Sequence, residues 1–186
     1  GKQSDTGDFI NRKRLVQLMA FYGLCTYLVI IVSFNLPFLM EEYHFSSGNS
    51  GIMISLFFLA IMTPGLFLNQ IIGWWKQRTE FYSLLCIAVG LGLIILSRSE
   101  WWIGLGCLFA GFGYGVIQPV VYDKTTRTAS SRKVTLALAF VMAMNYLAIL
   151  LCPFIIDWAG FIFRVHTQQF AFIFNLVVTV LAAGWA

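Results

Sequence analysis

Charged side chains are scarce in this sequence. Only 11% of its 186 residues are charged, whereas 59% are hydrophobic. A soluble domain carries about 25% charge, so this composition cannot supply a surface that faces water. Lipid must therefore be the main solvent, and the small net charge of +4 favours orientation in a membrane over binding of nucleic acid.

Groups that could support catalysis or bind a metal are equally sparse. His44 and His166 fall in predicted outer loops, and Asp157 is the only acid inside a predicted span, at its outer end. No nucleophile–base set and no phosphate-binding loop is visible. We therefore expect no enzyme, no metal and no cofactor. The cysteines lie in apolar runs without a CxxC pair, as small packing residues would: Cys25, Cys86, Cys107 and Cys152.

Long apolar runs dominate what is present. They predict an all-α membrane protein in which a cytoplasmic linker, residues 1–14, precedes a six-helix bundle, residues 15–186. The chain begins without Met and ends inside an apolar run, so we expect a piece of a longer protein. The six predicted spans cover residues 15–39, 51–72, 81–96, 101–122, 134–158 and 170–185.

Basic residues are distributed unevenly over the loops. Of the 12 Lys and Arg residues, all but Arg98 and Arg164 fall in residues 1–14, 73–80 and 123–133. Cytoplasmic loops carry the excess of Lys and Arg in membrane proteins. The pattern therefore places both termini in the cytoplasm.

Prolines recur in a regular order along the spans. They lie in the first, second, fourth and fifth spans, and the third and sixth have none. Two kinked helices followed by a straight one, twice over, indicate a 3+3 inverted repeat, in which broken helices surround the substrate of a transporter. The alternative is that four prolines in six membrane helices fall in this order by chance. The predicted kinks are at Pro37, Pro64, Pro119 and Pro153.

The stretch from residue 111 to residue 127 combines these features. Gly111, Gly113 and Gly115 give a thin helix face that a neighbour can approach closely. Gln118 then stands directly before Pro119, where freed backbone groups need a partner in protein or in a wet cavity. We interpret the stretch as a kinked helix that lines a pathway and ends in a charged cytoplasmic loop.

This layout resembles one half of a major facilitator superfamily transporter. In the loop after the second span that family carries Gly-x-x-x-Asp-Arg-x-Gly-Arg-Arg, of which Gly73 and Arg78 fit. Gln77, Glu80 and Phe81 replace three other positions. In the fifth span Pro153 fits the Gly-Pro of the antiporter branch. The small-residue positions before it are Ala139, Ala148 and Cys152.

The resemblance implies the C-terminal half of a drug or metabolite exporter of the proton-antiporter type. Its partner would be an N-terminal six-helix half, in a bacterial inner (cell) membrane. The first and fourth spans would face a central cavity, with the second and fifth beside it and the third and sixth as outer scaffold. The expected activity is secondary active transport of a small organic solute. The alternative is a six-span structural or assembly subunit that transports nothing.

Polar and flexible side chains inside the spans are the candidates for contact with a solute, because buried polar groups are costly in a membrane. For each of them, helix packing is the alternative. The pathway candidates are Asn35, Gln118, Asn145, Tyr27, Tyr114 and Met142. A second set could close the cytoplasmic side as a gate, or simply anchor the loops in the headgroup region: Gly73, Lys76, Arg78, Asp123 and Arg127.

Overall fold

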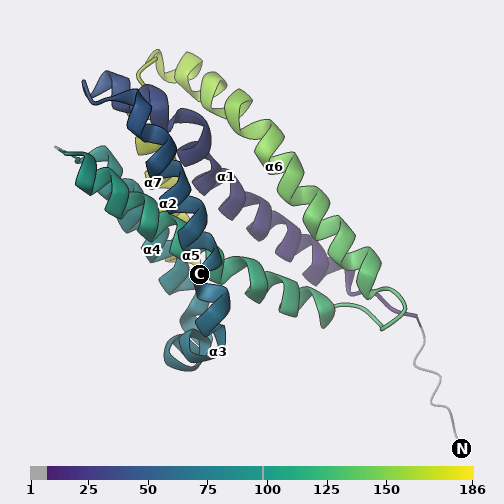
Figure 1. Ribbon diagram of the computed structural model, residues 1–186. Coiled ribbons are helices and arrows are strands. Elements are labelled where there is room, and N and C mark those ends of the chain that lie inside the picture. Colours follow the sequence, from purple (N-terminus) through teal and green to yellow (C-terminus); the bar gives the residue numbers. More distant parts are fainter. Residues whose placement is uncertain (1–7, 98) are drawn as a thin grey trace, which may run out of the picture.

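The protein is a bundle of long helices (Figure 1). The computed structural model describes residues 8–97 and 99–186, so predictions for residues 1–7 of the linker, with Lys2, and for Arg98 lie outside the described residues. Over those two ranges no strand forms. The helices are α1 (Arg12–Glu42), α2 (Ser50–Met62), α3 (Pro64–Trp75), α4 (Thr79–Ile95), α5 (Glu100–Thr126), α6 (Val134–Phe163) and α7 (Gln168–Trp185), with 3-10 turns at Ser47–Asn49 and Lys76–Arg78.

Each predicted span coincides with a helical segment. By length and composition, five helical stretches could cross a membrane, and α2 is a shorter apolar helix. One of those stretches, Pro64–Ile95, turns at Lys76, where a backbone φ of 50° separates α3 from α4. Together α2 and α3 therefore take the place of the second span. The all-α fold class with six apolar segments is confirmed.

The four prolines act differently on their helices. α1, α5 and α6 continue through Pro37, Pro119 and Pro153, whereas the second span is interrupted between α2 and α3. Pro64 opens α3 at its first position, where a helix start leaves an unpaired N–H in any case. Thr63, between the two helices, keeps helical φ and ψ of −58° and −44°, and the backbone first leaves helical geometry at Phe67, with φ −126° and ψ 19°. The bend of the second span therefore follows Pro64 by three residues.

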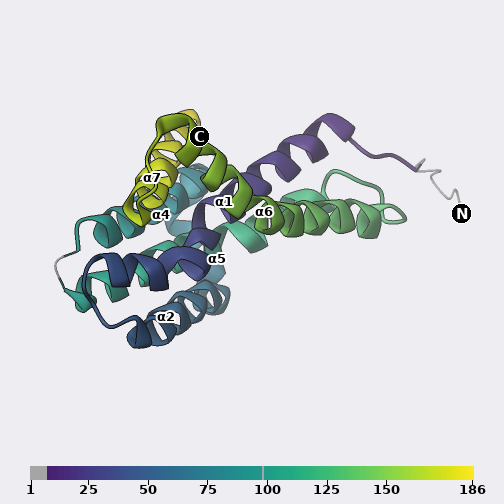
Figure 2. The same cartoon turned by 90° about the horizontal axis from the view of Figure 1, so that it is seen from above.

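The packing of the helices follows the predicted 3+3 repeat. The repeat makes α1 correspond to α5, α2 to α6 and α4 to α7. The contact of α2 with α5 then corresponds to the contact of α6 with α1, and both occur. The contact of α1 with α2 likewise becomes that of α5 with α6, while α4 packs on α7. Figure 2 shows α1 and α5 between α4 and α7 on one side and α2 on the other.

Glycines bring α5 close to two neighbours at once. A Cβ on Gly115 would lie 2.2 Å from the carbonyl oxygen of Ile61 in α2, and one on Gly111 would lie 2.3 Å from that of Phe57. A Cβ on Gly113 would lie 2.5 Å from the carbonyl oxygen of Ser83 in α4. The thin face predicted from the sequence is therefore two faces, and each receives a different helix.

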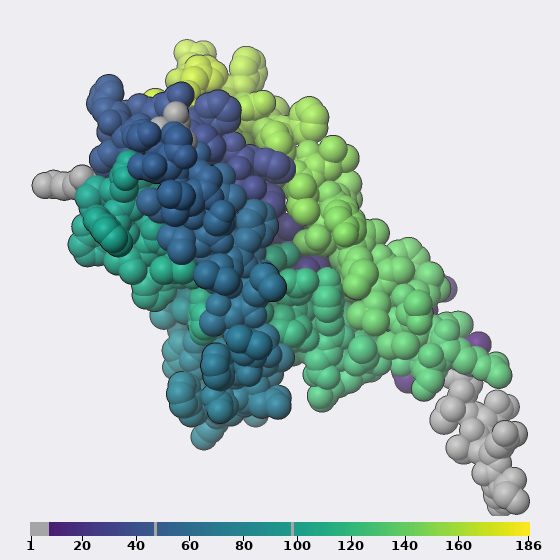
Figure 3. All heavy atoms as spheres, viewed as in Figure 1, coloured from purple at the N-terminus to yellow at the C-terminus, as the bar shows by residue number. Residues whose placement is uncertain are grey.

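Burial differs strongly between the helices. Among the five helical stretches long enough to cross a membrane, those of α1 and α5 are the most buried and that of α6 is the least buried. α6 forms an exposed ridge along one edge of the molecule (Figure 3). Large apolar side chains on this ridge, among them Phe140, Leu150, Phe154 and Phe161, face outward. Such a surface requires lipid or another protein chain as its neighbour.

Candidate functional site

A hydrogen-bonded cluster of uncharged side chains joins α1, α5 and α6. Three oxygens lie within hydrogen-bond distance of one another. Thr26 Oγ1 donates to Asn145 Oδ1 at 2.7 Å, Tyr114 OH lies 2.9 Å from the same Oδ1, and the two hydroxyls are 2.9 Å apart. Because each helix supplies one corner, the cluster fixes how the three helices sit against one another.

Tyrosine rings extend the cluster along the bundle. The rings of Tyr22 and Tyr114 stack with centroids 6.0 Å apart, and Tyr122 meets Tyr22 edge-on at 5.6 Å. Tyr22 OH lies 3.2 Å from both Tyr114 OH and Tyr122 OH. Gln118 Nε2 reaches Tyr122 OH at 3.5 Å. We call these six residues the tyrosine–amide cluster: Tyr22, Thr26, Tyr114, Gln118, Tyr122 and Asn145.

The tyrosine–amide cluster contains a polar group that has no hydrogen-bond partner in the part of the chain that the structure describes. Asn145 uses one end of its amide for Thr26 and Tyr114, and over the described residues its other end has no partner. Whichever way the amide is turned, one polar end stays free. Asn145, Gln118 and Tyr122 are also only partly buried. The cluster can therefore orient a solute by neutral hydrogen bonds and aromatic contact.

Half of the predicted pathway residues meet in this cluster. Tyr114, Gln118 and Asn145 belong to it, whereas Asn35, Tyr27 and Met142 do not. Asn35 donates from Nδ2 to Gln168 Oε1 of α7 at 2.7 Å. Tyr27 is buried, and Met142 points outward from α6.

Sequence analysis missed Tyr22, Thr26 and Tyr122. A signal for them exists, because residues four positions apart share one face of a helix. Tyr114, Gln118 and Tyr122 follow this spacing on α5, and Tyr22 and Thr26 follow it on α1. A search for polar residues at that spacing would have shown both faces.

The predicted gate residues are near one another but are not one network. Asp123 of α5 pairs at 2.9 Å with Arg127, the residue just after the helix, and both are exposed. Lys76 and Arg78 are exposed and pair with no carboxylate in residues 8–97 or 99–186. Gly73, near the end of α3, faces open space. A cavity of about 610 Å³ brings Lys76, Asp123 and Arg127 together.

The ion pair that does join two helices was not predicted. Lys124 of α5 binds the carboxylate of Glu80 at the start of α4. Their side chains are 37% and 31% exposed, which places the pair in contact with solvent or headgroups. A pair of this kind contributes at most about 1 kcal/mol, so it adds little to the packing of α4 on α5.

Comparison with known proteins places the chain in a family. The family model described as Major Facilitator Superfamily matches residues 11–186. No curated protein and no solved structure matches the chain. Members of this family are transporters rather than enzymes, and the apolar helices agree with a multi-pass protein. The chain belongs to the major facilitator superfamily of integral membrane transporters.

Proposed function

We propose that the chain is the C-terminal half of a secondary active transporter, which moves a small, neutral, partly apolar organic solute by alternating access. Its partner is then an N-terminal six-helix half. The observation that carries this proposal is the tyrosine–amide cluster, because it links α1, α5 and α6 through groups that retain free hydrogen-bonding capacity. In a membrane protein such groups belong to a pathway more often than to a lipid-facing surface.

The absence of charged side chains from the tyrosine–amide cluster supports a neutral solute. The six side chains of the cluster are hydroxyls and amides, and none of them is ionised at neutral pH. The rings of Tyr22 and Tyr114 offer flat apolar contact beside the polar atoms. A solute that carries both hydrogen-bonding groups and an apolar surface matches this arrangement best.

The proposal also covers the coupling ion and the orientation of the protein in the membrane. We place the transporter in a bacterial cell membrane with both termini in the cytoplasm, and we assign it export in exchange for protons. The predicted spans of this chain hold no His or acid at mid-depth. The group that carries the proton then belongs to the N-terminal half.

The cytoplasmic gate follows from the same division into halves. Glu80–Lys124 and Asp123–Arg127 are contacts inside this half, so they do not by themselves hold the two halves together. Lys76 and Arg78 are exposed at the turn between α3 and α4. We assign these two cations to contact with the N-terminal half when the cytoplasmic side is closed.

The substitution Tyr114→Phe tests the site in the full-length protein. A thermal-shift screen of neutral aromatic amides and alcohols supplies a binding solute, and a radiolabelled form of it reports flux in proteoliposomes. Tyr114→Phe removes the hydroxyl that holds Asn145 Oδ1 in place at 2.9 Å. One neutral hydrogen bond is worth about 1 kcal/mol, so we expect solute affinity to fall about fivefold through the misplaced amide. Gln118→Ala should weaken binding in the same direction.

Tyr82→Phe is the matched control, because Tyr82 packs on Trp75 and Phe81 away from the cluster. Its affinity should equal that of the unaltered protein. Unchanged binding and flux in both Tyr114→Phe and Gln118→Ala would remove the cluster from the pathway. Asn35→Ala in the same assay tests whether Asn35 contacts the solute at all.

A structural subunit without transport is the second candidate, and one kind of observation favours it. Asn175 Nδ2 donates to the backbone oxygen of Leu28 at 3.3 Å, and Asn35 bonds Gln168, so some polar groups in this bundle join one helix to another. Cysteines placed at positions 35, 118 and 145 separate the two candidates. In a transporter, positions 118 and 145 should react with aqueous thiol reagents, whereas in a packed subunit all three should stay silent. The buried Cys25 and Cys107 give the unreactive baseline.

A further inference from the structure

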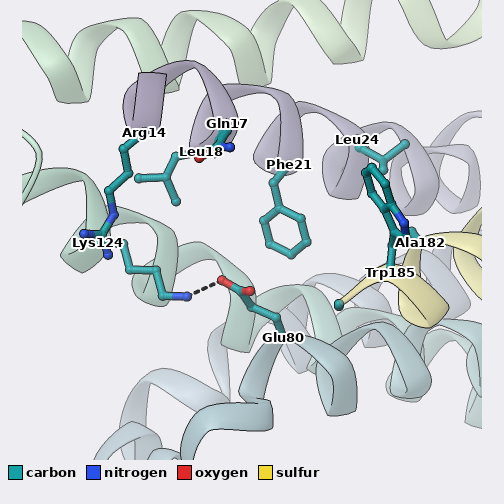
Figure 4. Close-up of a pocket in the computed structure, with 10 residues that line it drawn as sticks. Arg14, Gln17, Leu18, Phe21, Leu24, Glu80, Lys124, Ala182 and Trp185 are labelled. Atoms are coloured by element: carbon teal, nitrogen blue, oxygen red, sulfur yellow. Dashed lines mark hydrogen bonds and ion pairs between the residues drawn. The ribbon is translucent and has the colours of Figure 1, made fainter. Parts of the chain in front are cut away.

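A cavity with charged and apolar walls opens where α1 begins and α7 ends. Its volume is about 510 Å³, and α1, α4, α5 and α7 all contribute to it. The tyrosine–amide cluster does not line it. Figure 4 shows Glu80 and Lys124 joined on one side of this cavity, with Arg14 above Lys124 and Phe21 facing the opening. We call it the α1–α7 cavity.

Positive charge exceeds negative charge in the α1–α7 cavity. Arg14 and Lys124 face one carboxylate, Glu80, which is already bound to Lys124. Over the described residues Arg14 pairs with no carboxylate, and its side chain is exposed. Within the described residues, the charged part of the lining therefore carries one unpaired positive charge, which could bind an anionic group near Arg14 and Lys124.

Further along α1 the lining of the cavity becomes apolar and runs deeper into the bundle. Phe21 and Leu24 follow Arg14 along α1, and Ala182 of α7 faces the same space. A helix rises about 1.5 Å per residue, so Leu24 lies about 15 Å further along the bundle than Arg14. That depth is about half of a bilayer's hydrocarbon core. Figure 4 shows the indole of Trp185 beside Leu24, at the end of the cavity away from Arg14.

We propose that the α1–α7 cavity binds an anionic phospholipid of the cytoplasmic leaflet. The phosphate occupies the position between Arg14 and Lys124, and one acyl chain lies along Phe21 and Leu24. A free phosphate would use only the charged wall and a neutral lipid would leave the extra cation unmatched, so an anionic lipid fits both walls. Basic pockets between spans on the cytoplasmic side bind such headgroups. The proposal does not depend on transport.

Quenching of tryptophan fluorescence tests the lipid site directly. The purified full-length protein is reconstituted in phosphatidylcholine vesicles with increasing phosphatidylglycerol that is brominated on its acyl chains. Bromine quenches only nearby indoles, and Trp185→Phe identifies the part of the signal that comes from the apolar end of the cavity. We expect half-maximal quenching of Trp185 at an anionic fraction well below that needed with brominated phosphatidylcholine.

Charge variants give the decisive comparison. Each basic residue near the surface is worth about 1 kcal/mol to an anionic lipid, so Arg14→Gln should weaken the association about fivefold. Glu80→Gln should strengthen it, because it removes the carboxylate that competes for Lys124, and a gain of binding cannot come from misfolding. Arg132→Gln, which alters an exposed arginine outside the cavity, should change nothing.

Three outcomes would overturn the proposal. Equal quenching by brominated phosphatidylcholine and phosphatidylglycerol would show a lipid contact without selectivity. An equal loss in Arg132→Gln and Arg14→Gln would show a diffuse attraction to the whole basic surface. Displacement of the lipid by soluble glycerol phosphate at matched concentration would show that the site recognises the phosphate alone.

Discussion

At the scale of single residues, Asn35 and Asn145 show how one side-chain type serves two purposes. Both are amides in apolar helices. Asn35 has a partner on a distant helix, Gln168, whereas Asn145 accepts from two hydroxyls with one end of its amide and keeps the other end free. The two roles could not be told apart from the sequence alone, because Gln168, the partner of Asn35, is 133 positions away.

The pair of Asn35 and Gln168 can be tested by a double-mutant cycle. Single Asn35→Ala and Gln168→Ala variants and the double variant are unfolded in mixed micelles. Hydrogen bonds between membrane helices contribute about 0.6 kcal/mol on average, so we expect a coupling free energy near that value. The reason for the small size is that the unfolded chain in a micelle also finds polar partners.

The same variants separate packing from solute contact for Asn35. If the pair serves packing, Asn35→Ala lowers the free energy of unfolding and leaves solute affinity unchanged. A coupling free energy of zero together with a loss of affinity would instead return Asn35 to the pathway.

At the scale of helices, α5 depends on glycine spacing. Gly111 and Gly115 are four positions apart and face α2, whereas Gly113 lies on the side that faces α4. Small residues let membrane helices approach closely, where dispersion contacts between backbones hold them together. The contact therefore requires the absence of a side chain at these positions.

Gly115→Ala should loosen the contact between α5 and α2. The added methyl group would lie 2.2 Å from the carbonyl oxygen of Ile61, so one backbone must shift. Overpacking of this kind costs about 1–3 kcal/mol. We expect a lower melting temperature in detergent and a lower free energy of unfolding.

Gly92→Ala is the control for this prediction. It lies within α4, where a Cβ would meet nothing within 4 Å. Alanine favours the helix over glycine, so its stability should be equal or slightly higher. Equal losses in both variants would mean that glycine matters for chain flexibility rather than for close packing.

How far the sequence predicts this fold can be judged helix by helix. Hydropathy located every apolar segment, because a bilayer demands about 20 apolar residues in a row. The glycines of α5 predicted a close helix contact, but nothing in the sequence identified α2 and α4 as the two partner helices. The second span, which bends at Phe67 after Pro64, and the continuous helix at Pro119 also looked alike, since the effect of a proline depends on the packing around it.

The candidate site was predictable only in part for the same reason. Tyr114, Gln118 and Asn145 are conspicuous as polar groups in apolar runs. Thr26 and Tyr22 also lie in an apolar run, but only the approach of α1 to α5 shows that they meet Tyr114. The pair Glu80–Lys124 was likewise hidden, since its two charges are 44 positions apart.

At the scale of the whole molecule, the halves of a transporter of this kind move as nearly rigid bodies. Contacts within one half should therefore persist through the cycle. A backbone contact offers a test, because it ties the segment before α1 to the loop between α5 and α6. Asn11 N donates to the oxygen of Thr128 at 2.7 Å, and Ser130 N donates to that of Phe9 at 3.0 Å.

A disulfide between residues 10 and 129 would lock this contact. Ile10 and Ala129 form an antiparallel bridge with hydrogen bonds on either side. In such a pair the Cα atoms are about 4.5 Å apart, within the range that a disulfide spans. Ile10→Cys with Ala129→Cys should oxidise readily in a Cys86→Ala background, and peptide mass spectrometry after proteolysis measures the bond. Ile10→Cys with Thr135→Cys, a pair without this register, should oxidise far less.

Flux through the locked protein then decides whether this half is rigid. Because both ends of the bond belong to the same half, we expect equal transport before and after reduction in proteoliposomes. The contact would also be retained whichever side of the membrane is open. Inhibition that a reductant reverses would show instead that the loop after α5 moves against α1 during transport. In that case the motion would lie inside the half, and rocking of two rigid bodies could not be the whole mechanism.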